Sequence, residues 1–339
     1  MPLSIEKKMN NSQNAKQETI FKLAFKPFSG LKSPHLQTIA ACFSPPGKSP
    51  PSTQKIIFLD DGDALCCEIS TPAFWKENEK TIILIHGLGG CHQATYMIRL
   101  SRKFYTAGLR VVRVNMRSCG SGKEYAKRPY HGGLSNDIKQ VVLDLKNETP
   151  FSPITIIGFS LGGNIALKLA GELGAANSDL VHSTIAICPP IDLAETAEIM
   201  ARPINHLYNR YYMHHLDKLT KKWTLGHQFS NIFEFDKLVT APIWGFSSPS
   251  EYYKKSSSGF LLDKIVHPCH ILLCADDPFI NYRTCLDFKR SQAVKIELSS
   301  YGGHMGFLGW ADKEHGYYWL DHHLFKLING LAAGLFLCK

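Results

Sequence analysis

The pentapeptide Gly158-Phe159-Ser160-Leu161-Gly162 places a nucleophilic hydroxyl between two glycines. An apolar run over residues 154–157 precedes it, and apolar residues at helical spacing follow it. A serine in so tight a strand-to-helix turn takes a strained backbone, usually with positive φ, and side chains at the glycine positions would meet neighbouring backbone. The turn holds the hydroxyl over a helix N-terminus, where backbone N–H groups favour developing negative charge. We therefore predict that Ser160 is a nucleophile; the alternative is a glycine-rich turn with an incidental serine.

A serine hydroxyl attacks only when a general base removes its proton and a third group orients that base. His304, one of 15 histidines, lies in a glycine-flanked loop after the last predicted strand, and we predict that it is the base. Asp276 and Asp277 follow another predicted strand. Asp277 is the favoured acid because it lies deeper in the turn and Pro278 fixes the backbone after it. Either aspartate could instead cap a helix near Tyr282.

The glycine-rich run His86-Gly87-Leu88-Gly89-Gly90 follows the first predicted parallel strand. Such a loop lets backbone N–H groups turn towards the oxyanion of a reacting carbonyl. The expected donors are the Leu88 amide and the amide of Leu161, the residue after the nucleophile. We expect His86 to brace this loop rather than to act as a second base.

Strand-like and helix-like segments alternate along most of the chain, which predicts a mostly parallel sheet with helices on both faces. The expected parallel strands are 81–85, 110–115, 154–157, 183–188, 270–274 and 294–298, after a hairpin at 54–70. The expected helices are 94–107, 134–145, 161–173, about 282–290 and about 314–331. Residues 1–24 form an expected polar N-terminal extension, and residues 25–339 a single domain.

Alternation stops between about residues 191 and 263, where aromatic residues accumulate without an obvious buried strand. We expect a helical lid insertion whose aromatic side chains line an apolar pocket. The aromatic residues considered are Tyr208, Tyr211, Tyr212, Trp223 and Phe229. The alternative is that they only pack the insertion onto the core.

Bulk composition is that of an ordinary globular protein, with 44% hydrophobic and 20% charged residues. The ten cysteines include no C-x-x-C pair, which favours a reducing, cytoplasmic setting. The N-terminus is polar and basic without the apolar segment of a signal peptide. No run approaches the roughly 18 apolar residues of a membrane span.

The formal net charge is +9, and residues 81–180 carry 12 Lys and Arg against 6 Asp and Glu. This excess indicates either a solvated basic surface or peripheral contact with an anionic membrane surface. Nucleic-acid binding is not expected, because no recognition motif is present. The pairs His214-His215 and His322-His323 lack metal-ligand spacing, so no metal is expected.

These motifs, in this order, make the chain resemble the α/β-hydrolase superfamily, and more narrowly its YheT-type branch of hydrolases and esterases. Besides the run from Tyr301 to Leu308, the family-like stretches are residues 34–39, 115–117, 130–133, 235–236, 240–242 and 252–253. The resemblance covers about residues 25–330. It implies the α/β-hydrolase fold, with Ser160 as nucleophile, Asp277 as acid and His304 as base.

One position departs from the family pattern: Ser118 follows Arg117 where the family usually has glycine. We expect this loop near the mouth of the site, so that the change affects substrate shape. Eukaryotic relatives of the branch act on phospholipids and other lipid esters.

The predicted function is a serine hydrolase that cleaves carboxylic esters of lipid or short-chain acyl groups through an acyl-enzyme, without cofactor or metal. The alternatives are an acyltransferase or thioesterase with the same triad, and a non-catalytic binding protein on a hydrolase scaffold. The sequence identifies neither acyl length, head group nor oligomeric state.

Overall fold

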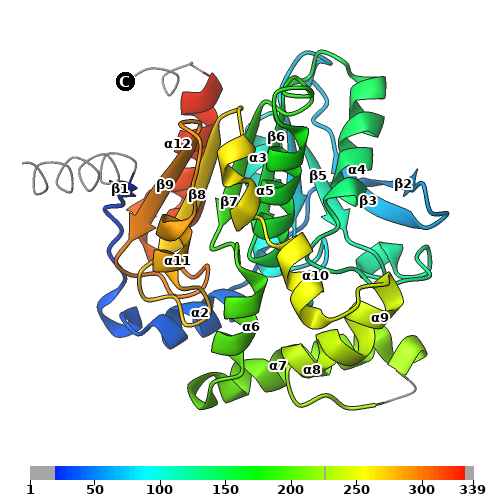
Figure 1. Ribbon diagram of the computed structural model, residues 1–339. Coiled ribbons are helices and arrows are strands. Elements are labelled where there is room, and N and C mark those ends of the chain that lie inside the picture. The colour runs from blue at the N-terminus through cyan, green and yellow to red at the C-terminus, as the bar shows by residue number, and fades with distance from the viewer. Residues whose placement is uncertain (1–19, 225–226, 333–339) are drawn as a thin grey trace, which may run out of the picture.

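The computed structural model describes residues 20–224 and 227–332 and contains a nine-stranded sheet in the order β1-β9-β8-β7-β6-β4-β5-β3-β2 (Figure 1). The strands are β1 (Ile20–Lys22), β2 (Thr53–Phe58), β3 (Ala64–Ser70), β4 (Thr81–Ile85), β5 (Arg110–Asn115), β6 (Ile154–Phe159), β7 (Ser183–Ile187), β8 (Cys269–Cys274) and β9 (Val294–Ser299). The β2–β3 and β3–β5 pairs are antiparallel, and all other pairs are parallel. The predicted mostly parallel sheet is confirmed.

The helices outside the lid are α2 (Pro34–Phe43), α3 (Thr95–Thr106), α4 (Ser135–Glu148), α5 (Leu161–Leu173), α11 (Tyr282–Asp287) and α12 (Trp319–Ala332). Successive side chains of a strand point to opposite faces of its sheet. Ile82 and Leu84 of β4 pack in one cluster with residues of α3 and α12, whereas Ile83 and Ile85 pack with residues of α4 and α5. Helices therefore cover both faces, and the sheet lies in the core.

The segment between β7 and β8 contains only helices over its described residues. These are α6 (Leu193–Met200), η3 (Pro203–Asn205), α7 (His206–Thr224), α8 (Ile232–Phe235), η4 (Asp236–Thr240), α9 (Ala241–Trp244), α10 (Pro249–Ser256) and η5 (Gly259–Lys264). Figure 1 shows α6 to α9 beyond one edge of the sheet, together with α2. This edge is where the parallel strands end, because α6 follows the C-terminal end of β7. We call residues 191–263 the lid.

Two sequence-based boundaries are wrong. Strand β1 pairs in parallel with β9, so the end of the predicted extension belongs to the sheet; residues 1–19 lie outside the described residues. The final helix begins at Trp319 rather than near residue 314 because an antiparallel hairpin, β10 (Leu308–Asp312) with β11 (Gly316–Tyr318), comes first. The Asp312 side chain accepts the His315 N–H at 2.6 Å and Gly316 takes φ 61°, and both features favour a turn over a helix.

Candidate active site

Ser160 lies between β6 and α5 with φ 50° and ψ −120°, the strained conformation expected of the predicted nucleophile. Its amide donates to the Ile187 carbonyl at 2.8 Å, which ties the turn to β7. A side chain at Gly158 would place Cβ 2.3 Å from the Gly162 oxygen, and one at Gly162 would place it 2.5 Å from the His86 oxygen. Both glycines are therefore required by backbone packing.

His304 joins the nucleophile to a carboxylate in one hydrogen-bonded chain. Its Nε2 lies 2.9 Å from the Ser160 hydroxyl, and its Nδ1 lies 2.8 Å from Asp277 Oδ2. The other Asp277 oxygen accepts the Phe279 and Ile280 amides at 2.8 and 3.1 Å. The side chains of His304 and Asp277 are 3% and 1% exposed, so water does not compete for these contacts. The structure thus brings together the three residues predicted as a triad.

Asp276 has a different position from its neighbour. Its Oδ1 accepts the amide of Gly303 at 2.9 Å, so it holds the loop that carries His304 rather than the imidazole itself. Burial raises the pKa of this carboxyl. The helix-capping alternative is also wrong, because Asn281 caps α11 by accepting the Arg283 amide at 3.2 Å.

The loop that carries His304 rests on α2, a support that the sequence analysis did not assign. The His304 amide donates to Thr38 Oγ1 at 2.9 Å, and that hydroxyl donates to the Pro34 carbonyl at 2.8 Å. Gln37 exchanges two hydrogen bonds with the backbone of Leu308, at 2.7 and 2.9 Å. In the sequence, the family-like stretch at residues 34–39 was the only sign of this support. Only the fold shows that these residues hold the loop of His304.

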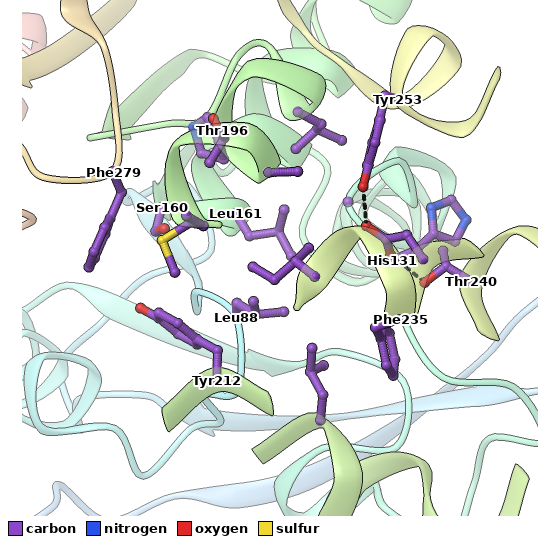
Figure 2. A pocket seen from close by; sticks show the side chains of 18 of the residues that line it. Leu88, His131, Ser160, Leu161, Thr196, Tyr212, Phe235, Thr240, Tyr253 and Phe279 are labelled. Carbon is purple, nitrogen blue, oxygen red and sulfur yellow. Dashed lines mark hydrogen bonds between the residues drawn. The ribbon is translucent and has the colours of Figure 1, made fainter. Parts of the chain in front are cut away.

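Hydrogen bonds in the glycine-rich loop occupy the amides of its glycines but not the Leu88 amide. The Gly87 and Gly89 amides donate to the hydroxyls of Tyr96 and Tyr130 at 2.9 and 2.7 Å, and the Gly90 amide donates to the Gly87 carbonyl at 3.1 Å. Within the part of the chain that the structure describes, neither the Leu88 nor the Leu161 amide has a backbone or side-chain acceptor. Figure 2 shows Leu88 and Leu161 beside Ser160. These amides are thus available to an oxyanion.

His86 braces this loop, as expected. Its Nε2 accepts the Met116 amide at 3.2 Å, so Nδ1 carries the proton and donates to the Gly87 carbonyl at 2.8 Å. Burial lowers the pKa of His86 to about 4, which keeps the imidazole neutral near pH 7. The structure gives it no contact with Ser160 among the hydrogen bonds of the described residues.

Two cavities meet at Ser160, and both are also lined by Leu88, Tyr212 and His304. The first, which we call the lid pocket, contains about 780 Å³ of space not filled by atoms, part of it open to solvent. Its walls are mainly apolar and aromatic, with Leu161, Leu193, Ala197, Met200, Leu216, Ile232, Phe235, Tyr252, Tyr253, Phe279 and Ile280 among the lining residues. Mainly apolar walls with a few polar groups are typical of a small-molecule site.

A polar cluster lies across the lid pocket from Ser160, where Figure 2 shows Tyr253 and Thr240 beside His131. The Asp236 carboxyl accepts the Thr240 hydroxyl at 2.6 Å and the Tyr253 hydroxyl at 2.9 Å. Burial raises the pKa of Asp236 to about 7 and lowers that of His131 to about 3. The family-like stretches 235–236, 240–242 and 252–253 therefore converge on one wall of the pocket.

The second cavity, which we call the α2 cleft, lies on the other side of Ser160. It is lined by Thr38, Ala41 and Cys42 of α2, residues 87–91 and 93–96, Arg99, Phe159, Tyr211, Met305 and Leu320, besides the four shared residues. Ser160 is thus bordered by one cavity on the lid side and by another on the α2 side.

The lid aromatics that the sequence analysis singled out have different positions. Tyr212 lines both cavities and Tyr211 lines the α2 cleft. The other three have packing or bracing contacts: Tyr208 packs on Phe279 with ring centres 4.6 Å apart, Phe229 packs on Phe235, and the Trp223 indole donates to the Lys127 carbonyl at 2.8 Å. Both predicted roles, pocket lining and packing, are therefore present.

Ser118 lines neither cavity at Ser160, so the expectation that it shapes the mouth of the site is wrong. It is buried with φ 62°, a conformation that favours glycine, which accounts for the family's usual residue. The preceding Arg117 forms ion pairs with Asp61, Asp63 and Asp137 at 2.7–2.8 Å, and these fix the loop.

Among the described residues, two groups of side chains are close enough to share a metal ion. One is Cys188 with Asp277 and His304, which includes two of the predicted triad residues. The other is Asp312 with His315 and His322 near the β10–β11 hairpin. His322 contacts Asp312 at 2.5 Å, while His323 pairs with Glu297 instead. Adjacent histidines therefore have separate partners.

Comparison with known proteins gives a consistent family. A model of the alpha/beta hydrolase fold matches residues 80–216. The candidate esterase YheT of Escherichia coli (strain K12) is 27% identical over 88% of this chain and 91% of its own length. Phospholipase ABHD3 of Homo sapiens and the monoacylglycerol lipase of Saccharomyces cerevisiae are each 26% identical, over 67% and 73% of this chain and 58% of their own lengths.

Solved structures show the same fold at lower sequence similarity. The 2,6-dihydroxy-pseudo-oxynicotine hydrolase aligns with TM-score 0.58 and 18% identity over 88% of this chain and 72% of its own. The Pyrococcus furiosus esterase Pf2001 aligns with TM-score 0.53 and 17% identity over 82% and 92%. The fold and the family match define an α/β hydrolase. Within that class, the chain is similar to the YheT-type esterase.

Proposed function

We propose that the chain is a carboxylic ester hydrolase that works through a Ser160–His304–Asp277 triad and an acyl-enzyme. The observation that carries this proposal is the continuous hydrogen-bonded chain from the Ser160 hydroxyl through His304 to Asp277, beside two amides without acceptors. The names of the relatives, an esterase, a phospholipase and a monoacylglycerol lipase, support an ester-cleaving hydrolase.

The first half of the reaction follows from the contacts around His304. Nδ1–H donates to Asp277, which leaves the Nε2 lone pair directed at the Ser160 hydroxyl. Nε2 takes the hydroxyl proton as Ser160 Oγ bonds to the ester carbonyl carbon, and Asp277 stabilises the imidazolium that forms. The carbonyl oxygen becomes an oxyanion and accepts the Leu88 and Leu161 amides.

In the second half, the imidazolium gives its proton to the alcohol oxygen as the carbonyl–oxygen bond breaks, which leaves an acyl-serine. Water then loses a proton to His304 and attacks the acyl carbon, and Ser160 leaves with the proton returned from Nε2. The steps therefore use one imidazole twice and return the enzyme to its starting state.

The two cavities give the substrate an orientation. The lid pocket is the better site for the acyl chain because its walls are mainly apolar, and the α2 cleft then receives the alcohol. In this arrangement the ester carbonyl lies between them at Ser160. The phospholipase and lipase relatives and the mainly apolar walls of the lid pocket favour a lipid-type acyl group over acetate.

The same triad would serve an acyltransferase or a thioesterase, which differ only in the acceptor or in the leaving group. The test is a panel of carboxylic esters, thioesters and amides, assayed with and without an added alcohol acceptor, beside labelling with a serine-directed fluorophosphonate. We expect labelling of the wild type but not of Ser160→Ala, with turnover highest for carboxylic esters in water. If the chain is labelled but turns over thioesters best, the proposal changes to a thioesterase. If it shows neither labelling nor turnover, the result favours a binding protein.

A further inference from the structure

Helix α2 exposes one apolar stripe. Leu36, Ile39 and Phe43 lie at spacing i, i+3, i+7, which puts them on one face of a helix. They are 48%, 43% and 82% exposed. The opposite face carries Gln37 and Thr38, which hold the loop of His304, so this helix is fixed to the catalytic machinery while its apolar stripe faces outwards.

The lid exposes a second stripe with the same spacing. Ile204, at the start of the lid's long helical segment, precedes Leu207 and Tyr211 of α7, and their exposed fractions are 74%, 77% and 53%. Single exposed apolar residues need no explanation, but two stripes of three on neighbouring helices are unusual for a protein surface.

The two helices are in direct contact. His35 Nδ1 of α2 lies 3.1 Å from the Tyr208 hydroxyl of α7, and the two rings stack with centres 5.7 Å apart. Figure 1 shows both helices beyond the same edge of the sheet. The stripes therefore belong to one surface, which we call the α2–α7 face: Leu36, Ile39, Phe43, Ile204, Leu207 and Tyr211.

This face adjoins the route to the nucleophile. The α2 cleft is lined by Thr38, Ala41 and Cys42 from α2 and by Tyr211 and Tyr212 from α7, and it reaches Ser160. Tyr211 belongs to both the face and the cleft. If another surface covered the α2–α7 face, a molecule could pass from that surface into the cleft without crossing bulk water.

The two chain segments that carry the face are basic in sequence. Residues 25–51 and 199–216 contain no Asp or Glu, whereas an even spread of 29 acidic residues over 339 would put about four in segments of this combined length. The same segments contain the exposed basic residues Lys26, Lys32, Lys48, Arg202 and Arg210. An apolar surface on two basic segments complements a lipid surface that carries negative head groups.

We propose that the α2–α7 face docks on an anionic phospholipid surface and opens the α2 cleft towards the lipid. The apolar stripes enter the boundary between head groups and acyl chains, and the five basic side chains contact lipid phosphates. Docking as such is independent of catalysis. The delivery of a lipid ester to Ser160 rests on the proposed function.

Docking is tested on the full chain carrying Ser160→Ala, which removes turnover from the measurement. Vesicles of phosphatidylcholine alone and of phosphatidylcholine with one-third phosphatidylglycerol are pelleted with the protein, at low and at high salt. We expect binding to the anionic vesicles that weakens with salt, because the attraction is partly ionic. No binding to either vesicle overturns the proposal.

A matched pair of double variants locates the contact. Phe43→Ser with Leu207→Ser removes two exposed apolar side chains from the face, and we expect about tenfold weaker binding to anionic vesicles. Phe74→Ser with Phe151→Ser removes two that are 93% and 83% exposed and that precede β4 and β6, at the sheet edge opposite Ser160. The control variant should bind like the parent. Equal binding by both doubles overturns the location.

Two further experiments test the role of charge and the possibility that the face binds a second copy of the chain. Arg202→Glu with Arg210→Glu should abolish the preference for anionic vesicles. In size-exclusion chromatography without lipid, the Ser160→Ala parent should elute as a monomer. The contrary result would be a dimer that the added substitutions Phe43→Ser and Leu207→Ser convert to monomer. Such a dimer would mean that the face binds a second copy of the chain, and it would overturn lipid docking.

Delivery is tested separately with Ser160 intact. The face variant should hydrolyse a water-soluble short-chain ester at the parental rate but a vesicle-embedded lipid ester about tenfold more slowly. Equal loss on both substrates overturns delivery. If the parent hydrolyses neither ester, the proposed function fails while the vesicle-binding result stands.

Discussion

The loops at the sheet edge and the lid are held in different ways. In the loops, backbone geometry is determined by close packing: Gly158 and Gly162 admit no side chain, and Asp276 and Thr38 each hold an amide of the His304 loop. The lid is a series of helices that pack partly in two small clusters and partly on the core beside the sheet. From this difference we expect the proposed chemistry to depend on backbone positions, and the choice of substrate to depend on lid side chains that can be exchanged.

The largest effects should come from the loops. We expect Ser160→Ala or His304→Ala to lower kcat by about 10⁴-fold or more, and the double variant to cost little further, because the residues act as one unit. Ester turnover and thermal unfolding of each variant check this. The melting temperature should stay near the parental value. Undiminished turnover by Ser160→Ala would refute the assignment and, with it, the contrast between loops and lid.

The two neighbouring aspartates sharpen the comparison within the loops. Asp277→Asn should lower kcat by about 10³- to 10⁴-fold, since the amide favours the wrong His304 tautomer. Asp276→Asn should cost far less, because an amide oxygen can still accept the Gly303 N–H. Steady-state kinetics of both variants at one pH separate the two. A larger loss in Asp276→Asn would transfer the orienting role to that residue.

A smaller, selective effect is expected from the lid. Ile232 lines the lid pocket, so Ile232→Phe should shorten the space for an acyl chain and shift the ratio of long to short esters several-fold. Leu238→Phe is the matched control, because Leu238 is half exposed on the lid and lines neither cavity. Fluorophosphonate labelling of Ser160 should persist in both. An unchanged ranking of esters in Ile232→Phe would remove the lid from substrate selection.

The last prediction concerns the dependence of stability on pH rather than turnover. Burial raises the pKa of Asp236 to about 7, above its unfolded value, so the folded state holds a proton that the unfolded state loses. Stability should therefore fall as pH rises from about 4 to about 7, by on the order of 4 kcal/mol at most. Asp236→Asn should lose this slope in denaturant unfolding across that range. The same slope in both proteins would mean that Asp236 is ionised in the folded state.

The sequence predicted the alternating elements because each β-strand of the core is buried on both faces and each covering helix has a periodic apolar face. Strands β4 and β5 begin and end at the predicted residues. Strand β1 and the β10–β11 hairpin escaped prediction because they are short and only partly buried, and their pairing partners decide them. Local pattern contains little of that information.

The candidate site shows the same division. By itself, the sequence determined Ser160 and His304 as the candidate nucleophile and base, since glycine-bounded turns after buried strands leave few alternatives. Only the tertiary structure decided between Asp276 and Asp277, because the choice depends on which carboxylate reaches His304 across the fold. The α2–α7 face is likewise a tertiary feature: its two stripes lie more than 150 residues apart in the chain, and only the His35–Tyr208 contact makes them one surface.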